Sequence, residues 1–351
     1  MKFRIGSILS VATMCGIISG GDGRVLAAGG LDKVLLDRAM ARAAGLPRLN
    51  ALIVAHHGKV QAERAFRGPG LTIPVNVKSV SKSVISALIG IAIARGALKD
   101  PDQRIADLLA NRLPAGADPR LRRITLDHLL SMRAGLERTS GRNYGRWVAS
   151  ADWVRHTLSR PFVEEPGGRM LYSTGNTHLL SAILTRSTGR STLHLARDWL
   201  GVPLGISIPP WQRDPQGIYM GGNNMMLSPR AMLRFGELYR NGGVYKGRRI
   251  LPEGWVKESW TPRTRSPFSG DSYGLGWFIA DVCSHRVYYA RGFGGQFIHV
   301  APTLGLTVVI TSSATTNTRV GGYRAALTAL LSDDLVPAAL KADGKTCGAG
   351  I

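Results

Sequence analysis

The pattern of apolar and polar positions divides the chain into a helical middle with strands on both sides. Apolar positions recur at helical spacing over residues 31–44. Two strand-like runs follow, over residues 51–55 and 60–66, and His57-Gly58-Lys59 between them is typical of a hairpin turn. From residue 79 to about residue 238 helical patterns dominate. Because His56 and His57 have no partner at metal-ligand spacing, they are interpreted as turn residues, and no metal site is predicted.

The C-terminal third of the chain returns to strand patterns. They cover residues 273–280, 287–290, 296–301 and 306–311, and an amphipathic helix over residues 323–331 follows. Strands at both chain ends predict an α/β (α+β) fold, with one mainly antiparallel sheet flanked by helices and an inserted all-helical lobe. Residues 29–351 are therefore expected to form one domain. Its α/β lobe would span about 29–78 and 240–340, and its helical lobe about 79–239.

Composition narrows the class of protein. The chain has 351 residues, which is enough for a large core, and 44% of them are hydrophobic. The net charge of +22 favours contact with anionic surfaces. The charges are scattered, however, and the zinc-finger, homeodomain and RNA-binding motifs are absent from the sequence. No specific nucleic-acid partner is predicted.

The N-terminus has the features of a secretory signal peptide. Lys2 and Arg4 precede an apolar stretch over residues 5–18, which is short for a membrane span, and small residues follow near 26–28. We expect a signal peptide over residues 1–28 and an exported protein, periplasmic or extracellular, whose mature form has no membrane span. The mature chain keeps Cys283 and Cys347, which form either one disulfide or two free thiols.

The segment Ser79-Val80-Ser81-Lys82 is the strongest chemical signal in the sequence. On a helix, residues three apart share one face, so the lysine amine can reach the serine hydroxyl. A serine becomes a good nucleophile when a neighbouring base takes its proton. Lysine acts as that base only when burial or nearby cations keep it uncharged, and the apolar residues that follow supply such burial. The alternative is an ordinary polar helix start.

Two later segments add candidate groups. Tyr172 lies in a turn before an apolar helix, and a tyrosine near an ammonium group can have its pKa lowered enough to act as a base. Gly292 and Gly294 flank Phe293 beside a strand, where glycine allows a substrate to approach the backbone. The backbone N–H groups of Ser79 and Phe293 would then form an oxyanion hole.

In this order, the segments resemble the serine hydrolases related to class C β-lactamases, D-alanyl-D-alanine peptidases, esterases and nylon-oligomer hydrolases. The resemblance runs from about residue 52 to residue 311. It includes further matching segments at residues 124–136, 214–217, 273–277 and 294–296. The resemblance implies that Ser79 is acylated and that Lys82 and Tyr172 transfer protons. It also implies a helical lobe inserted into an α/β lobe.

Two departures from the family pattern bear on the substrate. The family's amide-binding Asn is replaced by Thr174, with Asn176 two residues later. The family's third motif begins with Lys or His, whereas Ala290-Arg291-Gly292 stands here. Because neighbouring strand residues point to opposite faces, the cleft-facing cation is expected to be missing. Both departures favour an esterase or linear amidase over a dedicated β-lactamase or peptidase.

The sequence therefore predicts a serine hydrolase that acts without cofactor, through an acyl-serine, on small-molecule esters or linear amides. Candidate substrate contacts are Asn176, Tyr219, Gly292, Gly294 and Gln296. Whether Lys82 or Tyr172 is the base stays open. One alternative is a penicillin-binding D-alanyl-D-alanine peptidase or β-lactamase. A second is a non-catalytic envelope protein that binds anionic polymer.

Overall fold

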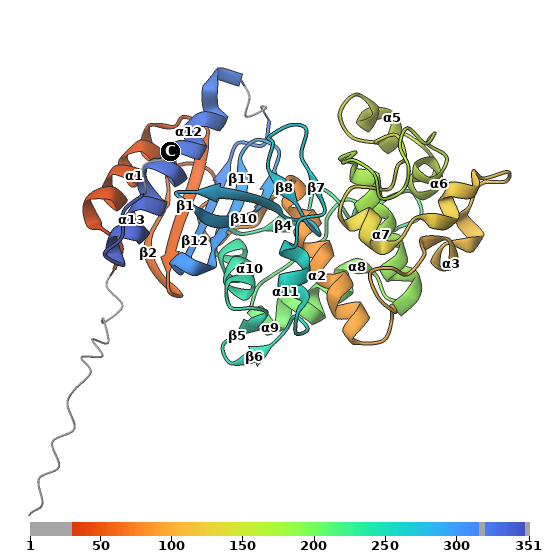
Figure 1. Ribbon diagram of the computed structural model, residues 1–351, viewed down its shortest axis with the longest axis horizontal. Helices are drawn as coiled ribbons and strands as arrows, with labels where there is room; N and C mark the ends of the chain where they lie inside the picture. Colours follow the sequence, from red (N-terminus) through yellow and green to blue (C-terminus); the bar gives the residue numbers. More distant parts are fainter. Residues whose placement is uncertain (1–29, 316–319, 348–351) are drawn as a thin grey trace, which may run out of the picture.

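The computed structural model describes residues 30–315 and 320–347. The expected signal peptide lies outside these residues. One lobe is built on an eight-stranded antiparallel sheet in the order β2-β1-β12-β11-β10-β9-β8-β7 (Figure 1). The strands are β1 (Leu49–His56), β2 (Lys59–Ala65), β7 (Thr264–Arg265), β8 (Ser272–Tyr273), β9 (Phe278–Val282), β10 (His285–Gly292), β11 (Gln296–Ala301) and β12 (Leu306–Ser312). Strand β1 pairs with both β2 and the last strand, β12, which confirms the predicted fold class.

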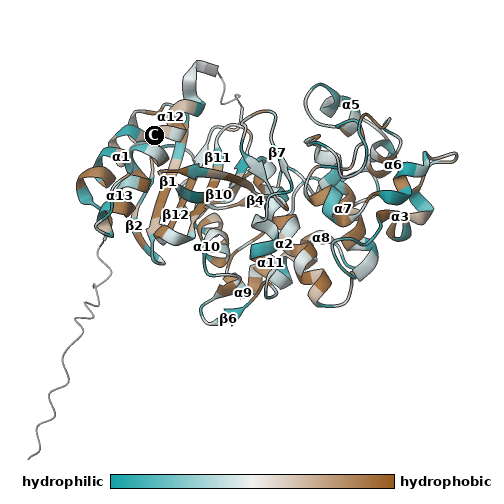
Figure 2. Ribbon diagram, viewed as in Figure 1, coloured by the Kyte–Doolittle hydropathy of each residue, from teal (hydrophilic) through white to brown (hydrophobic). Residues whose placement is uncertain are grey.

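The central strands are buried on both faces, and their alternation assigns each residue to one of two cores. Leu52 and Val54 of β1 pack with the terminal helices, whereas Ile53 and Ala55 pack with helices of the middle of the chain. Figure 2 shows that β1 and β12 are largely hydrophobic. The sheet is therefore the middle layer of its lobe.

Helices cover both faces of this sheet. On one face lie α1 (Lys33–Gly45), α12 (Tyr323–Ala329) and α13 (Val336–Ala342). On the other, α10 (Pro229–Arg240) packs against β1, β11 and β12. The sequence boundary near residue 239 had placed this helix in the helical lobe. An amphipathic helix shows the same period whether its apolar side meets helices or a sheet, so periodicity could not assign it.

The helical lobe surrounds α7 (Thr174–Thr188), which packs against several of its neighbours. The other helices of the middle segment are α2 (Ser81–Ala94), α3 (Ile105–Leu108), α4 (Leu126–Leu130), α5 (Tyr144–Val148), α6 (Trp153–Leu158), α8 (Thr192–Ala196) and α9 (Val202–Leu204). Helix α11 (Trp255–Trp260) follows α10, beyond this segment. Helix α2 contacts both α7 and β10, so it joins the two lobes.

Two short pairings and a disulfide complete the described chain. Strand β3 (Val75–Asn76) pairs with β4 (Met226–Leu227), and β5 (Val244–Tyr245) pairs with β6 (Arg248–Arg249). Cys283 and Cys347 form a disulfide with their Cα atoms 4.9 Å apart, so the first of the two sequence alternatives is the one observed. Within the described residues, no helix combines the length and apolar sequence needed to cross a membrane.

Candidate active site

Ser79 lies in a 3₁₀ turn, η1 (Lys78–Val80), that runs directly into α2. Lys78 before it has a left-handed backbone with φ 52°, an uncommon conformation for a side chain of this size. Its N–H donates to the Asn76 side chain at 2.9 Å, and its carbonyl accepts from the Ser81 hydroxyl at 2.5 Å. The Ser81 hydroxyl also accepts from the Met225 N–H at 3.1 Å. These bonds fix the strained turn and thereby the position of Ser79.

The spacing in Ser79-x-x-Lys82 brings the two side chains together. In a 3₁₀ turn, residues three apart lie on the same side, and the Lys82 Nζ is 3.0 Å from the Ser79 Oγ. The amine also donates to the Gly222 carbonyl at 2.6 Å. Lys82 is only 2% exposed, and this burial lowers its pKa from 10.5 to about 7. Near neutral pH, a substantial fraction of this amine is therefore uncharged and has a lone pair for the serine proton.

The Gly222 carbonyl is held in place by close packing on α7. A Cβ atom at Gly221 would lie 2.0 Å from the Thr177 carbonyl oxygen, and one at Gly222 would lie 2.9 Å from that of Thr174. Only glycine allows this loop to approach the helix so closely. The Gly-Gly pair thus positions the hydrogen-bond acceptor of Lys82 and the residue that follows, Asn223.

Tyr172 borders the same pair from the other side. Its ring stacks on Phe278 with centroids 6.2 Å apart, and the Lys82 Nζ lies 4.8 Å from its centroid. Burial raises the pKa of Tyr172 to about 12, although a hydrogen bond with Ser79 and the charge of Arg291 lower it in part. The lowered pKa expected from a neighbouring ammonium is therefore wrong, because desolvation outweighs the nearby charge. The phenol stays protonated at neutral pH.

Ser79 and Tyr172 open onto a cleft of about 610 Å³ between the two lobes. Gly292 and Phe293, at the end of β10, form its sheet side. A Cβ atom at Gly292 would lie 2.3 Å from the Val77 carbonyl oxygen, so glycine lets β10 lie directly against the turn that carries Ser79. Phe293 is 49% exposed at the rim. Both backbone donors expected for an oxyanion hole belong to residues that line this cleft.

Comparison with known proteins agrees with this arrangement. The family model for beta-lactamase matches residues 40–333, most of the chain. The chain belongs to the beta-lactamase family. No curated protein sequence matches it significantly.

Several solved structures have folds similar to that of this beta-lactamase family member, at low sequence identity. A protein assigned as a 6-aminohexanoate-dimer hydrolase, from Bacillus anthracis, is 21% identical with a TM-score of 0.70, covering 89% of this chain and 82% of that one. EstCE1, a hydrolase with promiscuous acyltransferase activity, is 18% identical with a TM-score of 0.69, covering 86% and 99%. A D-stereospecific amidohydrolase from Streptomyces sp. is 16% identical with a TM-score of 0.67, covering 85% and 98%. At these identities the likeness shows the fold.

The expected lack of a cleft-facing cation is wrong. Arg291, Arg138 and Lys78 all line the cleft. Ala290 is 1% exposed and belongs to the core between the sheet and the middle helices. Ala290 and Arg291 do point to opposite faces of the strand, but it is Arg291, and not Ala290, that lines the cleft. This beta-lactamase relative therefore has a cation beside, rather than at, the family's usual position.

Four of the five residues expected to contact substrate lie elsewhere, and none of the four is among the described residues that line the cleft. Asn176 is buried within α7. Tyr219 packs on Trp211 with ring centroids 4.7 Å apart. The Gln296 side chain donates to the Ser312 carbonyl at 2.7 Å and so joins β11 to β12. Gly294 lies in the turn between β10 and β11, and only Gly292 reaches the cleft.

Sequence reasoning missed polar groups that loops of the helical lobe bring to the cleft. Asn223 lines it, and its side-chain amide donates to the Tyr144 hydroxyl at 3.1 Å. Ser140 lines it too, with its hydroxyl 2.9 Å from that of Thr174. The search for an amide two residues after Tyr172 could not find a side chain that arrives from a distant loop. The adjacent pair Gly221-Gly222, just before Asn223, was the sequence feature that could have indicated a loop packed closely enough to reach the site.

The other segments shared with the family carry the scaffold. The Asp127 carboxylate bridges Arg133 at 2.6 Å and Arg263 at 2.8 Å, joining α4 to the segment before β7. Asp214 lies 3.1 Å from His178 of α7, with both side chains fully buried. The Asp127 ion pairs join the helical lobe to the segment that leads into β7, whereas the Asp214–His178 contact lies within the helical lobe. None of these side chains is among the described residues that line the cleft.

Proposed function

We propose that this protein is a serine hydrolase that forms an acyl-serine intermediate at Ser79 with small esters or linear amides. The observation that carries the proposal is the 3.0 Å contact between the Ser79 Oγ and the Lys82 Nζ, with burial lowering the pKa of Lys82 to about 7. A neutral amine at this distance is a competent general base. Membership of the beta-lactamase family supports the same chemistry.

The positions of the groups support the following proton transfers. Lys82 takes the Ser79 proton as the Oγ attacks the substrate carbonyl carbon, and the N–H groups of Ser79 and Phe293 stabilise the oxyanion. Tyr172, whose pKa is raised to about 12, starts as a neutral phenol. It gives its proton to the leaving alcohol or amine and receives one from the Lys82 ammonium. Water then attacks the acyl-serine by the reverse route, which releases the acid and regenerates Ser79.

The charges of the cleft indicate what kind of ester or amide fits. Arg291, Arg138 and Lys78 place positive charge around Ser79. Guanidinium groups bind carboxylates with paired hydrogen bonds. We therefore infer that the acyl or leaving part of the substrate carries a carboxylate. This replaces the expectation that the cleft has no cation for a substrate carboxylate.

A second candidate, a D-alanyl-D-alanine peptidase, is favoured by one observation. Asn223 and Arg291 both line the cleft, and together they can hold an acyl amide and a terminal carboxylate. The non-catalytic alternative has less support. Burying a lysine that could be charged costs stability, and a polymer-binding surface gains nothing from it.

Labelling with a fluorophosphonate probe tests the proposal. Wild type should be labelled on Ser79, identified by peptide mass spectrometry, and Ser79→Ala should show no label. Ser332→Ala makes the same substitution at a serine whose hydroxyl bonds Asp333 on the surface, and it should label as wild type does. Equal labelling of wild type and Ser79→Ala would refute the proposal. Competition by ampicillin at micromolar concentration would favour the peptidase.

A further inference from the structure

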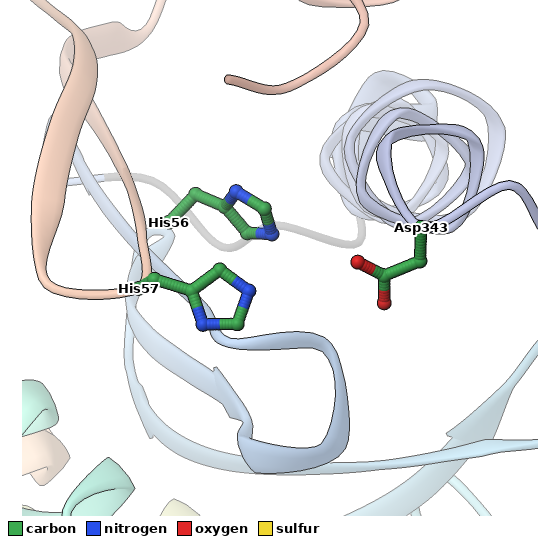
Figure 3. Close-up of side chains that lie close together, drawn as sticks. All are labelled: His56, His57 and Asp343. Atoms are coloured by element: carbon green, nitrogen blue, oxygen red, sulfur yellow. The ribbon is translucent and has the colours of Figure 1, made fainter. Parts of the chain in front are cut away.

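A second cluster of chemically active side chains lies at the other end of the sheet from the cleft. The ligand atoms of His56, His57 and Asp343 all lie within 4.8 Å of one another. His56 and His57 are at the β1–β2 turn, and Asp343 follows α13 (Figure 3). Sequence spacing gave the two histidines no partner. The fold supplies one from the C-terminal segment.

The two imidazoles share one side because of the turn between β1 and β2. Neighbouring residues of a strand point to opposite faces. His57 and Gly58 instead have φ values of 47° and 80°, as in a two-residue type I′ turn. This brings the ring centroids of His56 and His57 to 4.2 Å. Histidine is among the few residues other than glycine that are enriched at positive φ, so the turn accommodates His57.

The His57 ring packs against Gly305. The His57 N–H donates to the Gly305 carbonyl at 2.8 Å. A Cβ atom at Gly305 would lie 2.5 Å from the His57 Nδ1, so only glycine leaves room for the imidazole in this position. His56 is 3% exposed, on the sheet face that the terminal helices cover. His56 is therefore buried, whereas His57 lies against Gly305 and is exposed to solvent.

Asp343 is placed where a carboxylate alone is unfavourable. It caps the C-terminal end of α13, where the helix dipole is negative. Figure 3 shows its carboxylate pointing toward the two imidazoles. The Lys345 ammonium lies 3.6 Å from the carboxylate. The disulfide from Cys347 to Cys283 ties this segment to the β9–β10 turn, at the same end of the sheet. The Lys345 ammonium partly offsets the dipole, and a metal ion held by the imidazoles would compete with it for the carboxylate.

We propose that His56, His57 and Asp343 bind a zinc ion. Two imidazole nitrogens and one carboxylate oxygen form a common donor set for zinc, with a fourth position left to water. Ligand atoms at about 2.0–2.2 Å from a tetrahedral zinc ion lie about 3.4 Å from one another. The ligand atoms here lie within 4.8 Å of one another, so side-chain movements of about 1 Å bring them to this spacing. Calcium and magnesium prefer oxygen ligands throughout, and two imidazoles select against them.

The proposed site is structural and independent of the hydrolase proposal. It joins the β1–β2 hairpin to the C-terminal segment, two parts of the chain far apart in sequence. A ligand that binds the folded protein and not the unfolded chain raises the melting temperature. The site should therefore stabilise the packing of the terminal helices on the sheet.

Calorimetric titration with zinc chloride tests the proposal on the untagged mature chain with its disulfide intact. We expect one zinc per protein and a rise in melting temperature of about 5 °C or more at saturation. Cobalt(II) in place of zinc should give the visible absorption of a tetrahedral site. Binding of no zinc, or of cobalt without tetrahedral absorption, overturns the proposal.

Single substitutions separate this site from adventitious binding. His57→Asn should keep the fold, because Asn suits the left-handed turn, and Asp343→Asn keeps the shape of the side chain. Each should weaken zinc binding at least about tenfold. His194→Asn changes an exposed histidine of α8 and should bind as wild type does. Unchanged zinc affinity in both His57→Asn and Asp343→Asn would exclude the site.

One substitution should strengthen binding. Lys345→Gln removes the ammonium beside Asp343, which competes with a metal ion for the carboxylate. We expect zinc to bind about threefold or more tightly to this variant, since a nearby positive charge is removed. A general effect of surface charge is controlled by Lys341→Gln, whose ammonium pairs with Asp32 at 2.7 Å instead. Equal affinities in the two lysine variants would contradict the assigned position of the ion.

Discussion

The two ends of the central sheet hold two clusters that the sequence builds in different ways. At the cleft end, Ser79 and Lys82 are three residues apart and meet through local backbone geometry. At the other end, His56 and His57 meet Asp343 only because the last helix returns to the first strand. A local cluster can be identified from spacing, whereas a cluster assembled by the fold has no spacing to identify.

The ends also differ in how charge is managed. At the cleft end, burial lowers the pKa of Lys82 to about 7, so a substantial fraction of the amine is uncharged near neutral pH. At the far end, Asp343 is partly exposed at a helix C-terminus with Lys345 beside it. Desolvation therefore lowers the pKa of a base, Lys82, at one end. At the other end, the Asp343 carboxylate lies at the negative end of a helix dipole, a position that favours binding of a cation.

The largest expected effect is on Lys82 as the base. Lys82→Arg should lower kcat/KM at least about 1000-fold, because a guanidinium stays protonated and cannot accept the serine proton. In wild type, kcat/KM should rise with pH through a midpoint near 7, as Lys82 loses its proton. Steady-state kinetics with an activated ester between pH 5 and 9 measures both.

Lys59→Arg makes the same change at an exposed position of β2 and should retain wild-type kinetics. If Lys82→Arg keeps more than about a tenth of wild-type kcat/KM, Lys82 is not the base, and Tyr172 remains as the candidate.

This difference between the two ends explains which parts of the fold and of the site could be predicted from the sequence. The Ser79–Lys82 pair and the antiparallel sheet come from local spacing and from periodicity, and the cleft position of Tyr172 comes from the resemblance to the family. The chosen substrate contacts were mostly misplaced, because strand alternation does not say which face meets the cleft, and Arg291 lies on the face that was not chosen. Asn223 reaches the cleft from a loop whose path depends on glycine packing against α7. Such placements depend on tertiary contacts.

The next effect is on stability. The pKa of Lys82 is about 7 in the folded protein, below its usual 10.5, so between these pH values the unfolded chain binds more protons and wild-type stability rises with pH. Lys82→Met removes this dependence. The free energy of unfolding of wild type relative to Lys82→Met should therefore increase by about 2–3 kcal/mol from pH 6 to pH 9. Urea unfolding at the two pH values measures it. A constant difference would mean that Lys82 is not held uncharged.

A smaller effect concerns the substrate carboxylate. Arg291→Gln should raise KM about tenfold or more for esters that carry a carboxylate, because a charged hydrogen bond is lost. Neutral p-nitrophenyl esters should change less than about threefold. Arg286→Gln is a matched control on the same strand, since Arg286 pairs with Asp281 at 3.0 Å near the far end. Equal losses for charged and neutral esters would show that Arg291 supports the structure of the cleft instead of binding the carboxylate.

The smallest expected effect is of zinc on the cleft itself. Strand β10 runs from His285, at the end of the sheet that holds the proposed zinc site, to Gly292 at the cleft, and its seven steps of about 3.4 Å span about 24 Å. That distance is about three Debye lengths at physiological salt, so the charge of the ion is screened at Ser79. Saturating zinc should therefore change kcat/KM less than about twofold in wild type and in His57→Asn, measured against EDTA-treated protein. A larger change in wild type that is lost in His57→Asn would show that the sheet couples its two ends.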